Sequence, residues 1–474
     1  MTHRKPLVEA LTAFQQPLPI SFHVPGHKNG ELSGLPQAIR TALSYDLTEV
    51  TGLDDLHYPE EAIRDAQSLL AATYGADESF FLVNGSTVGN LAMIHAVCKE
   101  GDTVIVQRNS HKSVFHALEL AKTRPVYVAP EWDDESLTAV GVAFADIAAA
   151  VTAYPEAKAV VLTYPNYYGM ATAGLKETIA LCHSKGIAVL VDEAHGAHFQ
   201  IGEPYPASAL ALGADVVVHS AHKTLPAMTM GSFLHVKGNL VNAEKIKKYL
   251  RMLQSSSPSY LIMASLDDAR AFVQNYTQPD MRHFEDKREQ FVKGLKSIPK
   301  LGVFESDDPL KLMLRSEYNS GFQLKKELEK VGIHAELADP YQVLLILPLL
   351  KQPHSYPFAE VRSRIKEAVQ ALTQAPREAV IVKMPIQQNI SVPEISYAQL
   401  DMEAREWISY TKAFGRISAG MVIPYPPGVP LIVPGEKWTM DKLEGLMDYL
   451  STGAQIQGDL RLEEKLICVL PATN

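Results

Sequence analysis

Two ionisable residues near the ends of predicted strands could do covalent chemistry together. Asp192 ends the apolar run Ala188–Asp192, and Lys223 follows shortly after the run Val216–His219. In open α/β sheets, ligands bind at the carboxyl ends of the strands. The separation of 31 residues (223 − 192) leaves room for a strand–helix–strand crossover, so both side chains can reach one crevice.

A lysine and an aspartate placed in this way match the needs of a pyridoxal 5′-phosphate (PLP) enzyme. The lysine amine forms a Schiff base with the cofactor, and a substrate amine then displaces it. A carboxylate pairs with the pyridine nitrogen and keeps it protonated, so that the ring can take up carbanion electrons. The plainer alternative makes Asp192 a helix N-cap and Lys223 a surface lysine. A lysine directly after a buried strand, flanked by Ser and His, favours the PLP interpretation.

The segment Gly85-Ser86-Thr87 is expected to hold the cofactor phosphate. It lies between the predicted strand Phe80–Val83 and a helix expected to begin near Gly89. A helix N-terminus offers free N–H groups and the positive end of the helix dipole, and the two hydroxyls add donors. Ser86 can also be a simple N-cap, because capping and anion binding use the same N–H groups.

Short apolar runs alternate with helical patterns from about residue 60 to 240, which is typical of a parallel sheet covered on both faces. The expected helices are Lys5–Gln15, Glu60–Tyr74, Gly89–Cys98 and Met281–Leu295. The expected strands are Phe80–Val83, Thr103–Gln107, Pro125–Val128, Ala159–Thr163, Ala188–Asp192, Val216–His219 and Gly231–Val236.

The pattern changes after residue 295. A smaller α/β unit is expected there, with helices Ser320–Val331 and Pro357–Ala375. The last segment is expected to begin with a helix over Ser396–Phe414 and to end with the helix Met440–Ser451. We therefore expect an N-terminal arm (1–45), a PLP-binding large domain (46–295), a small α/β domain (296–390) and a C-terminal domain (391–474).

Composition narrows the class of protein. The chain has 474 residues, 46% hydrophobic and 21% charged, which are ordinary values for a soluble globular protein. A net charge of −10 argues against nucleic acid or an anionic membrane as a partner. Cys98, Cys182 and Cys468 are widely spaced, with no metal-ligand pattern. We expect a cytoplasmic protein that holds no metal, since no signal peptide or membrane span is visible.

The motifs extend over nearly the whole chain in one order, and together they resemble the Orn/Lys/Arg decarboxylase family in its short form, without an N-terminal wing domain. The matching stretches are Phe22–Lys28, Gly52–His57, Asn84–Asn90, Arg108–Ser113, Asp192–Gly196, Ser220–Lys223, Ser255–Pro258, Tyr425–Pro430 and Pro434–Glu436. The resemblance implies an aspartate-aminotransferase-like fold, with a mostly parallel seven-stranded sheet between helices and smaller C-terminal α/β domains.

The resemblance also implies roles for residues around the cofactor. It assigns Ser86 and Thr87 to the phosphate, and Ser220 and His222 look like further phosphate contacts. A histidine at the position of His111 stacks on the pyridine ring in this family. In this family the position of Ala194 packs on the opposite face of the ring. His195 follows directly after Ala194 and is expected to line the substrate side, where longer relatives carry an aromatic residue. Relatives commonly read Pro-Thr-Tyr-x-Gly where this chain reads Pro165-Asn166-Tyr167-Tyr168-Gly169, and Asn166 could contact the phenolic oxygen of PLP.

Substrates of this family carry a distal amine or guanidinium, which calls for an acidic pocket. Asp54, Asp55 and Glu436 are the candidates, each within a matching motif. The alternative is that the two aspartates cap the following helix and that Glu436 is solvated. Ser255 matches a position that reaches the phosphate of the neighbouring subunit, which implies a homodimer with shared active sites and leaves higher oligomers open.

The leading functional hypothesis is PLP-dependent decarboxylation of arginine, lysine or ornithine, giving CO2 and an amine for polyamine biosynthesis. A second hypothesis is another PLP reaction, transamination or elimination; aminotransferases typically bind the α-carboxylate with a bidentate arginine. The arginines considered for that role are Arg108, Arg251, Arg270 and Arg416. A third is a PLP-binding regulatory homologue without turnover. The residues leave the choice among the three amino acids open.

Overall fold

The computed structural model describes residues 4–372, 389–425 and 428–472. Pro426 and Pro427, within the Tyr425–Pro430 motif, and the end of the helix expected over Pro357–Ala375 lie outside these ranges. The chain forms two compact units, one of residues 1–97 and 186–276, the other of residues 98–185 and 277–474. The four-part division expected from the sequence stays a prediction.

The first unit contains four strands of the large sheet, in the order β1 (Glu78–Leu82), β9 (Ser232–Val236), β8 (Val216–His219) and β7 (Ala188–Asp192). Strands β7 and β8 run parallel, with Asp192 opposite Val218, whereas β9 is antiparallel to both of its neighbours. Because β7 and β8 are parallel, their carboxyl ends meet at one edge of the sheet. The residues that follow these two strands are therefore brought together.

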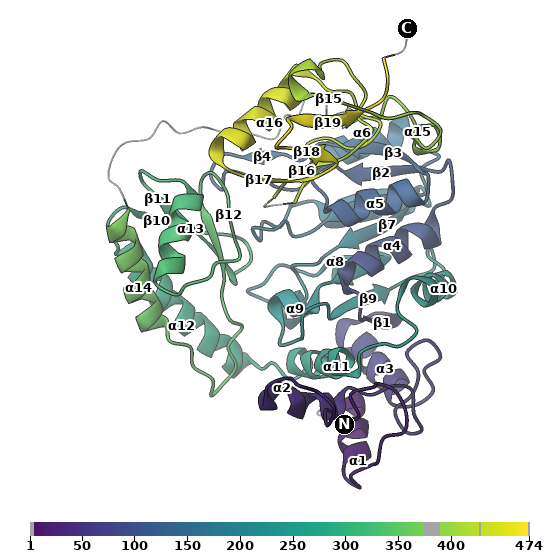
Figure 1. Cartoon of the computed structure of the whole chain (residues 1–474), viewed down its shortest axis with the longest axis vertical. Helices are drawn as coiled ribbons and strands as arrows, with labels where there is room; N and C mark the ends of the chain where they lie inside the picture. The colour runs from purple at the N-terminus through teal and green to yellow at the C-terminus, as the bar shows by residue number, and fades with distance from the viewer. Residues whose placement is uncertain (1–3, 373–388, 426–427, 473–474) are drawn as a thin grey trace. The chain divides into compact units, whose positions relative to one another are not determined.

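The first unit also contains helices and two 3-10 turns. They are α1 (Pro6–Gln15), α2 (Gln37–Ala42), α3 (Ala62–Tyr74), α4 (Gly85–Val97), α8 (Ala209–Leu212), α9 (Ala221–Thr224), α10 (Ala243–Leu253) and α11 (Tyr260–Gln274), with 3-10 turns η1 (Leu43–Tyr45) and η2 (Phe199–Ile201). Both α3 and α4 pack on β1, and α10 packs on α4 (Figure 1). Gly89 allows close packing of α4, because a Cβ at this position would lie 2.8 Å from side-chain atoms of Leu82 and Val218.

The second unit contains the strands β6 (Ala159–Thr163), β2 (Thr103–Gln107), β3 (Arg124–Val128) and β14 (Ile390–Ser391), in that order. β2 runs parallel to β6 and β3, and β14 is antiparallel to β3. Strand β14 adds one strand to the seven expected from the sequence. The same region contains α5 (Lys112–Leu120), α6 (Phe144–Ala153), α7 (Leu175–Ser184) and the short pair β4 (Trp132–Asp133) and β5 (Thr138–Ala139). The chain is thus an α/β protein with a large, mostly parallel sheet.

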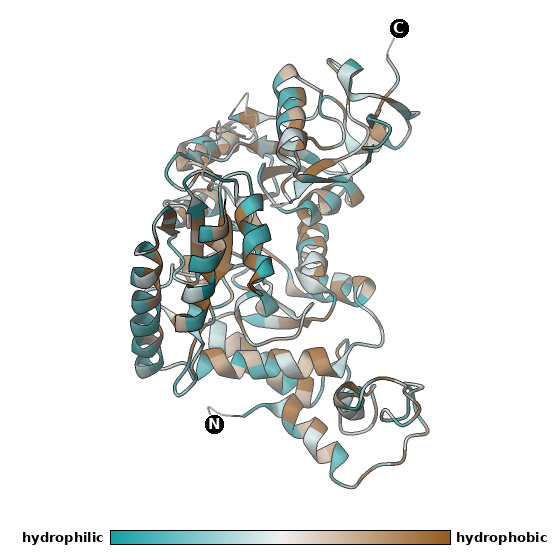
Figure 2. Cartoon of the chain, turned by 60° about the vertical axis from the view of Figure 1, so that its left-hand side comes forward, coloured by the Kyte–Doolittle hydropathy of each residue, from teal (hydrophilic) through white to brown (hydrophobic). Residues whose placement is uncertain are grey.

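A smaller antiparallel sheet of the second unit has the order β10 (Leu301–Glu305), β11 (Lys311–Ser316), β13 (Val343–Ile346) and β12 (Leu337–Ala338). The helices of this part are α12 (Gln278–Lys296), α13 (Gly321–Lys330) and α14 (Phe358–Ala371). In Figure 2 its strands are brown, while the helices beside them alternate between teal and brown. This is the pattern of amphipathic helices that cover an apolar sheet.

The expected helix over Ser396–Phe414 is wrong. The structure has only a short helix there, α15 (Tyr397–Leu400), followed by strand β15 (Glu406–Ser409) and a 3-10 turn, η3 (Tyr410–Lys412). β15 pairs with β19 (Leu466–Val469), a partner about sixty residues away, and this non-local pairing overrides the local helical pattern. The remaining elements are β16 (Val422–Tyr425), α16 (Met440–Thr452), β17 (Gln455–Gly458) and β18 (Leu460–Arg461). They pack around the fully buried Trp438.

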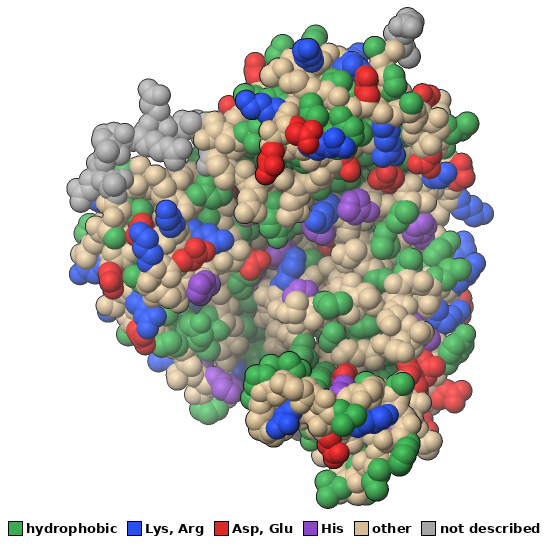
Figure 3. Space-filling view, viewed as in Figure 1, with side chains coloured by type: hydrophobic (Ala, Val, Ile, Leu, Met, Phe, Trp, Pro, Cys, Tyr) green, Lys and Arg blue, Asp and Glu red, His purple; other side chains and the backbone are tan. Residues whose placement is uncertain are grey.

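Lys and Arg side chains are interspersed with Asp and Glu on the face shown in Figure 3. Over the described ranges, the structure has no helix that combines the length and the apolar character needed to cross a membrane.

Candidate active site

Lys223 lies in the short helix α9, directly after strand β8. Its side chain is half-buried, and its Nζ lies 3.0 Å from Nε2 of His195. His195 comes from the turn that follows β7, and it is 3% exposed. The two parallel strands therefore bring an amine and an imidazole into hydrogen-bond contact.

Asp192 ends β7 and is 3% exposed. Its carboxylate accepts hydrogen bonds from the Asn90 side chain (2.8 Å) and from the Ala194 backbone N–H (3.2 Å). Burial raises the pKa of Asp192, while the positive charge of Lys223 and the two hydrogen bonds act in the opposite direction. A buried carboxylate with a raised pKa favours a cationic partner, and a protonated pyridine nitrogen is such a partner.

The predicted phosphate loop forms the start of helix α4. The helix begins at Gly85, four residues earlier than expected, so Ser86 and Thr87 lie in its first turn. Gly85 has φ +76°, a conformation that glycine adopts without strain. The hydroxyl of Ser220 donates to that of Ser86 at 2.7 Å, which joins this turn to the segment before Lys223. A lysine amine, an anchored buried carboxylate and a hydroxyl-bearing helix N-terminus in one unit fit PLP.

His222 and Ser255 lie in the same unit. His222 is half-buried, and its Nδ1 lies 3.0 Å from the carbonyl oxygen of Gly231. Ser255 is exposed, and its backbone N–H donates to the Asn84 side chain at 3.3 Å, next to the phosphate loop. Their contacts with the phosphate stay predictions.

The two aspartates expected to read the substrate lie in the loop before helix α3, and Asp54 binds backbone N–H groups at the start of that helix. The Asp54 carboxylate accepts backbone N–H groups of five residues, Asp55, Glu60, Glu61, Ile63 and Arg64. Although burial opposes ionisation, these hydrogen bonds hold the pKa of Asp54 below its ordinary value. The Asp55 carboxylate accepts the N–H of His57 at 2.7 Å. The geometry of Asp54 is that of helix capping, whereas Asp55 closes a turn before the helix. A role of either residue in substrate binding stays a prediction.

His111 and Asn166 belong to the second unit. The His111 ring caps helix α5 by accepting the Ser113 backbone N–H at 3.3 Å. The Asn166 side-chain oxygen accepts the N–H groups of Tyr168 and Met170, and its amide nitrogen donates to the Ala139 carbonyl. Asn166 therefore fixes its own turn. Stacking by His111 and a PLP contact by Asn166 stay predictions.

Glu436, also in the second unit, is 7% exposed and is ion-paired. Its carboxylate lies 2.9 Å from Arg108 Nη2 and 3.1 Å from Lys442 Nζ, and it accepts the Val433 N–H at 3.0 Å. Burial raises the pKa of Glu436, but Arg108 and Lys442 outweigh this effect and hold it below its ordinary value. The solvated alternative is wrong for this residue, since the carboxylate is buried between two cations.

Comparison with known proteins decides the family. The profile of the Orn/Lys/Arg decarboxylase major domain matches residues 5–291, and that of the C-terminal domain matches residues 375–460. The chain belongs to the Orn/Lys/Arg decarboxylase family. It is thus a PLP-dependent amino-acid decarboxylase by family, and PLP is its cofactor.

Similar proteins cover nearly the whole chain. A protein of Bacillus subtilis (strain 168), named uncharacterized protein YaaO, is 44% identical over 98% of both chains. An arginine decarboxylase of the same organism is 33% identical over 96% of both chains. The crystal structure of the Francisella novicida lysine decarboxylase LdcF has a TM-score of 0.79 at 18% identity, covering 99% of this chain and 81% of that one. This last likeness shows the fold.

The sequence interpretation missed two residues of this decarboxylase, Asn90 and the role of Arg108 as a partner of Glu436. Asn90 lies within a matching motif but received no role, although it donates to Asp192. Its position four residues after Ser86, on the same face of α4, was the available signal. Arg108 was considered only as a carboxylate clamp, and nothing local in the sequence links it to Glu436.

We expect Glu436→Gln to destabilise the protein by about 3–5 kcal/mol, because it leaves the buried Arg108 and the partly buried Lys442 without their carboxylate. Since the pKa of Glu436 is lowered on folding, the stabilisation is present above the ordinary carboxylate pKa and is lost as the pH falls through the folded value. Denaturant unfolding at neutral and acidic pH measures both effects. Glu444→Gln, on the exposed side of α16, is the matched control. Equal stability of the two variants at neutral pH would contradict this account.

Proposed function

We propose that this chain removes the α-carboxylate of a basic L-amino acid, either arginine, lysine or ornithine, giving CO2 and the corresponding amine. The observation that carries this proposal is the arrangement of Lys223, His195 and Asp192 at the carboxyl ends of β7 and β8. The similarity over 96% of both chains to an arginine decarboxylase supports a basic substrate.

In this proposal the chain's own residues bind, orient and move protons. PLP, when bound, supplies the electron sink for the bond that breaks. Lys223 supplies the amine that attaches the cofactor, and Asp192, anchored by Asn90, keeps the ring nitrogen protonated. His195, at 3.0 Å from Lys223 Nζ, can accept or return the lysine proton when substrate exchanges with the lysine.

The arginines support decarboxylation over transamination. Three of the four arginines considered as carboxylate clamps form ion pairs within the protein, namely Arg108 with Glu436, Arg270 with Asp267 and Arg416 with Glu406. The fourth, Arg251, has its guanidinium 5.5 Å from the centre of the Tyr58 ring. A decarboxylase places the α-carboxylate perpendicular to the plane of the conjugated system, so that the bond that breaks can conjugate with it, and this placement does not require a strong arginine clamp.

The test is the identity of the amine product. PLP-loaded protein is incubated separately with L-arginine, L-lysine and L-ornithine, and the products are identified by mass spectrometry. We expect agmatine, cadaverine or putrescine from at least one, with a kcat/KM well above that for L-norleucine, an uncharged analogue of lysine. Absence of amine from all three, with cofactor bound, would refute the proposal. A place in polyamine biosynthesis and a homodimer with shared sites remain proposals that rest on the resemblance.

A further inference from the structure

Four buried polar side chains form a continuous hydrogen-bonded chain within the first unit. The Glu193 carboxylate lies 2.8 Å from Nε2 of His219, and Nδ1 of His219 lies 3.1 Å from Nε2 of His235. Nδ1 of His235 lies 2.7 Å from the hydroxyl of Ser79. Glu193 and both histidines are 0% exposed, and Ser79 is 5% exposed. This series of hydrogen-bonded side chains crosses three strands of the sheet, from β1 through β9 to the end of β8.

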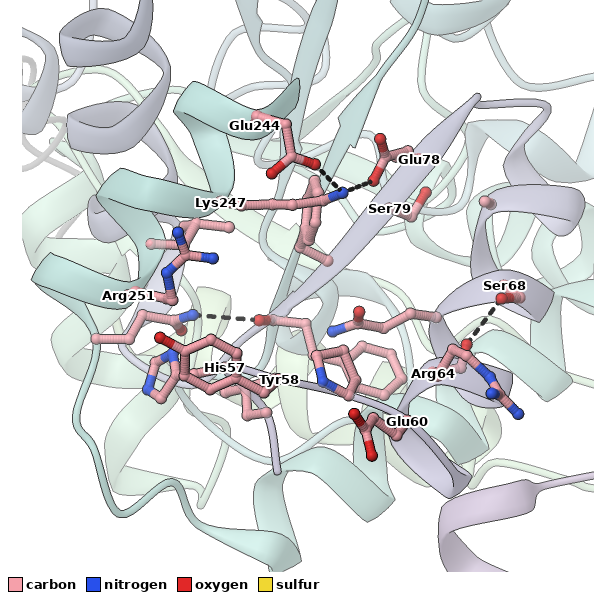
Figure 4. A pocket seen from close by; sticks show the side chains of 18 of the residues that line it. His57, Tyr58, Glu60, Arg64, Ser68, Glu78, Ser79, Glu244, Lys247 and Arg251 are labelled. Atoms are coloured by element: carbon pink, nitrogen blue, oxygen red, sulfur yellow. Dashed lines mark hydrogen bonds and ion pairs between the residues drawn. The ribbon is translucent and has the colours of Figure 1, made fainter. Parts of the chain in front are cut away.

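One end of this chain lies at a cavity. Ser79 lines a cavity of about 460 Å³ over strand β1, with walls from α3 and α10 (Figure 4). In the same view, Lys247 is ion-paired with Glu78 and Glu244. The Lys247 ammonium therefore already has two carboxylate partners. Ser79, in the wall of the cavity, is the outer end of the series of hydrogen-bonded side chains.

The other end of the chain fixes the turn that follows Asp192. The Glu193 carboxylate accepts the hydroxyl of Ser208 at 2.9 Å and the N–H of Ala209 at 3.0 Å. The Glu193 backbone donates to Val218, and its carbonyl accepts the N–H of Gly196, both at 2.9 Å. A Cβ on Gly196 would lie 2.7 Å from Cγ of Glu193, so the turn is packed directly on this side chain. That turn carries His195, and Asp192 immediately precedes it.

The protons on these four hydrogen-bonded side chains can be arranged in two ways, and in each way every contact has one donor and one acceptor. Burial first, and then the charge of His219, hold the pKa of His235 well below its ordinary value, so His235 is neutral. His235 can donate to Ser79 while it accepts from a cationic His219, or it can accept from Ser79 while it donates to a neutral His219. In both, Nε2 of His219 donates to Glu193. The Tyr74 ring covers both histidines, with centroid distances of 4.5 Å to His235 and 5.2 Å to His219.

A fully buried carboxylate–imidazole pair is a costly way to hold a fold together, because both groups lose their hydration. Apolar side chains of similar volume are often as stabilising as a buried ion pair, so such a pair is weak evidence for stability. Here the pair joins the turn after Asp192 to the end of β8, four residues before Lys223. A change in this pair would therefore act first on the ends of β7 and β8, which carry Asp192 and lead to Lys223.

We propose that Glu193 and His219 are positioning residues. Their contact fixes the positions of Asp192 and His195 relative to Lys223, and it places the Glu193 carboxylate next to the turn that follows Asp192. This inference rests on the proposed function, because it takes Lys223 and Asp192 as the groups that hold PLP. The carboxylate–imidazole pair acts through the turn, without touching substrate or cofactor.

The test compares Glu193→Gln, which keeps the volume and removes the charge, with Ser79→Ala, which breaks the chain at its far end. We expect kcat of Glu193→Gln to fall by about 10- to 100-fold, by analogy with the loss seen when the hydrogen-bond partner of a metal-ligating side chain is removed, with KM nearly unchanged. The pH midpoint of the visible absorbance of the lysine-bound cofactor should shift in Glu193→Gln, and the midpoint of Ser79→Ala should not. In cofactor-free protein with ¹⁵N-labelled histidine, a low-field N–H resonance of His219 should be present in the wild type and absent from Glu193→Gln.

The outcomes separate this inference from the proposed function. A folded Glu193→Gln variant with wild-type kcat and an unchanged midpoint would overturn the inference, as would an equal effect of Ser79→Ala. If Glu193→Gln does not fold, His219→Gln decides, since it keeps a donor toward Glu193 and loses the link to His235. Failure of the proposed function would appear in the wild type itself, as absence of amine product.

Discussion

Replacing Lys223 by alanine should abolish the visible absorbance of the bound cofactor and reduce turnover by at least about a thousandfold, which corresponds to about 4 kcal/mol in the barrier. The reason is that the Lys223 amine follows directly from strand β8 and lies against His195, whereas the resemblance offers no second lysine for this role. Absorbance spectra and single-turnover assays at saturating PLP measure both effects.

The control for non-specific attachment of PLP is Lys237→Ala. Lys237 lies just after β9 in the same unit, and its Nζ donates to the Leu210 carbonyl, away from the strand ends that carry Lys223. This variant should keep the wild-type spectrum. Borohydride reduction followed by peptide mapping should place the cofactor on Lys223 in the wild type. A reduced cofactor found on another lysine would overturn the assignment.

Asp192→Asn should leave PLP able to bind while lowering kcat by about 10²- to 10⁴-fold, or about 3–5 kcal/mol, because a neutral ring is a poorer electron sink. The substitution keeps the size of the side chain, and the new carbonyl can still accept from Asn90. Wild-type turnover in this variant would mean that the partner of the ring nitrogen is a different group.

The cofactor-free form of the same variant provides an internal check on folding. Burial raises the pKa of Asp192, so the folded chain binds this proton more tightly than the unfolded chain does. The stability that comes from the protonated form is present at low pH and is lost as the pH rises through the folded pKa. Asparagine removes that dependence, so the cofactor-free variant should melt no lower than the wild type at neutral pH. A large loss of stability would show that Asp192 has a structural role instead.

The buried parallel strands could be predicted from the sequence with their bounds. Ala159–Thr163, Ala188–Asp192 and Val216–His219 are continuous apolar runs, and the structure places strands over the same residues. Lys223 and Asp192 followed from those strand ends. The helix expected over Ser396–Phe414 was wrong, because strand β15 in this segment pairs with β19, about sixty residues away, and the local pattern does not show this partner.

Contacts between distant segments could not be predicted. Glu436 was expected either to read the substrate or to be solvated, but its two cationic partners come from Arg108, 328 residues earlier, and from α16. Asp54 looks the same in sequence whether it binds substrate or caps a helix, and only the five backbone N–H groups around it show the capping. The chain from Glu193 to Ser79 depends on the pairing of β1, β9 and β8, which places Ser79 opposite His235.

The most direct test of the central claim follows the carboxyl carbon. PLP-loaded protein is incubated with the basic amino acid that gives product, labelled with ¹³C at C1, and the labelled gas and the amine are quantified together. The account predicts one ¹³CO2 for each amine formed, no keto acid, and neither product with Lys223→Ala. A labelled keto acid that retains the ¹³C, or turnover without ¹³CO2, would contradict it.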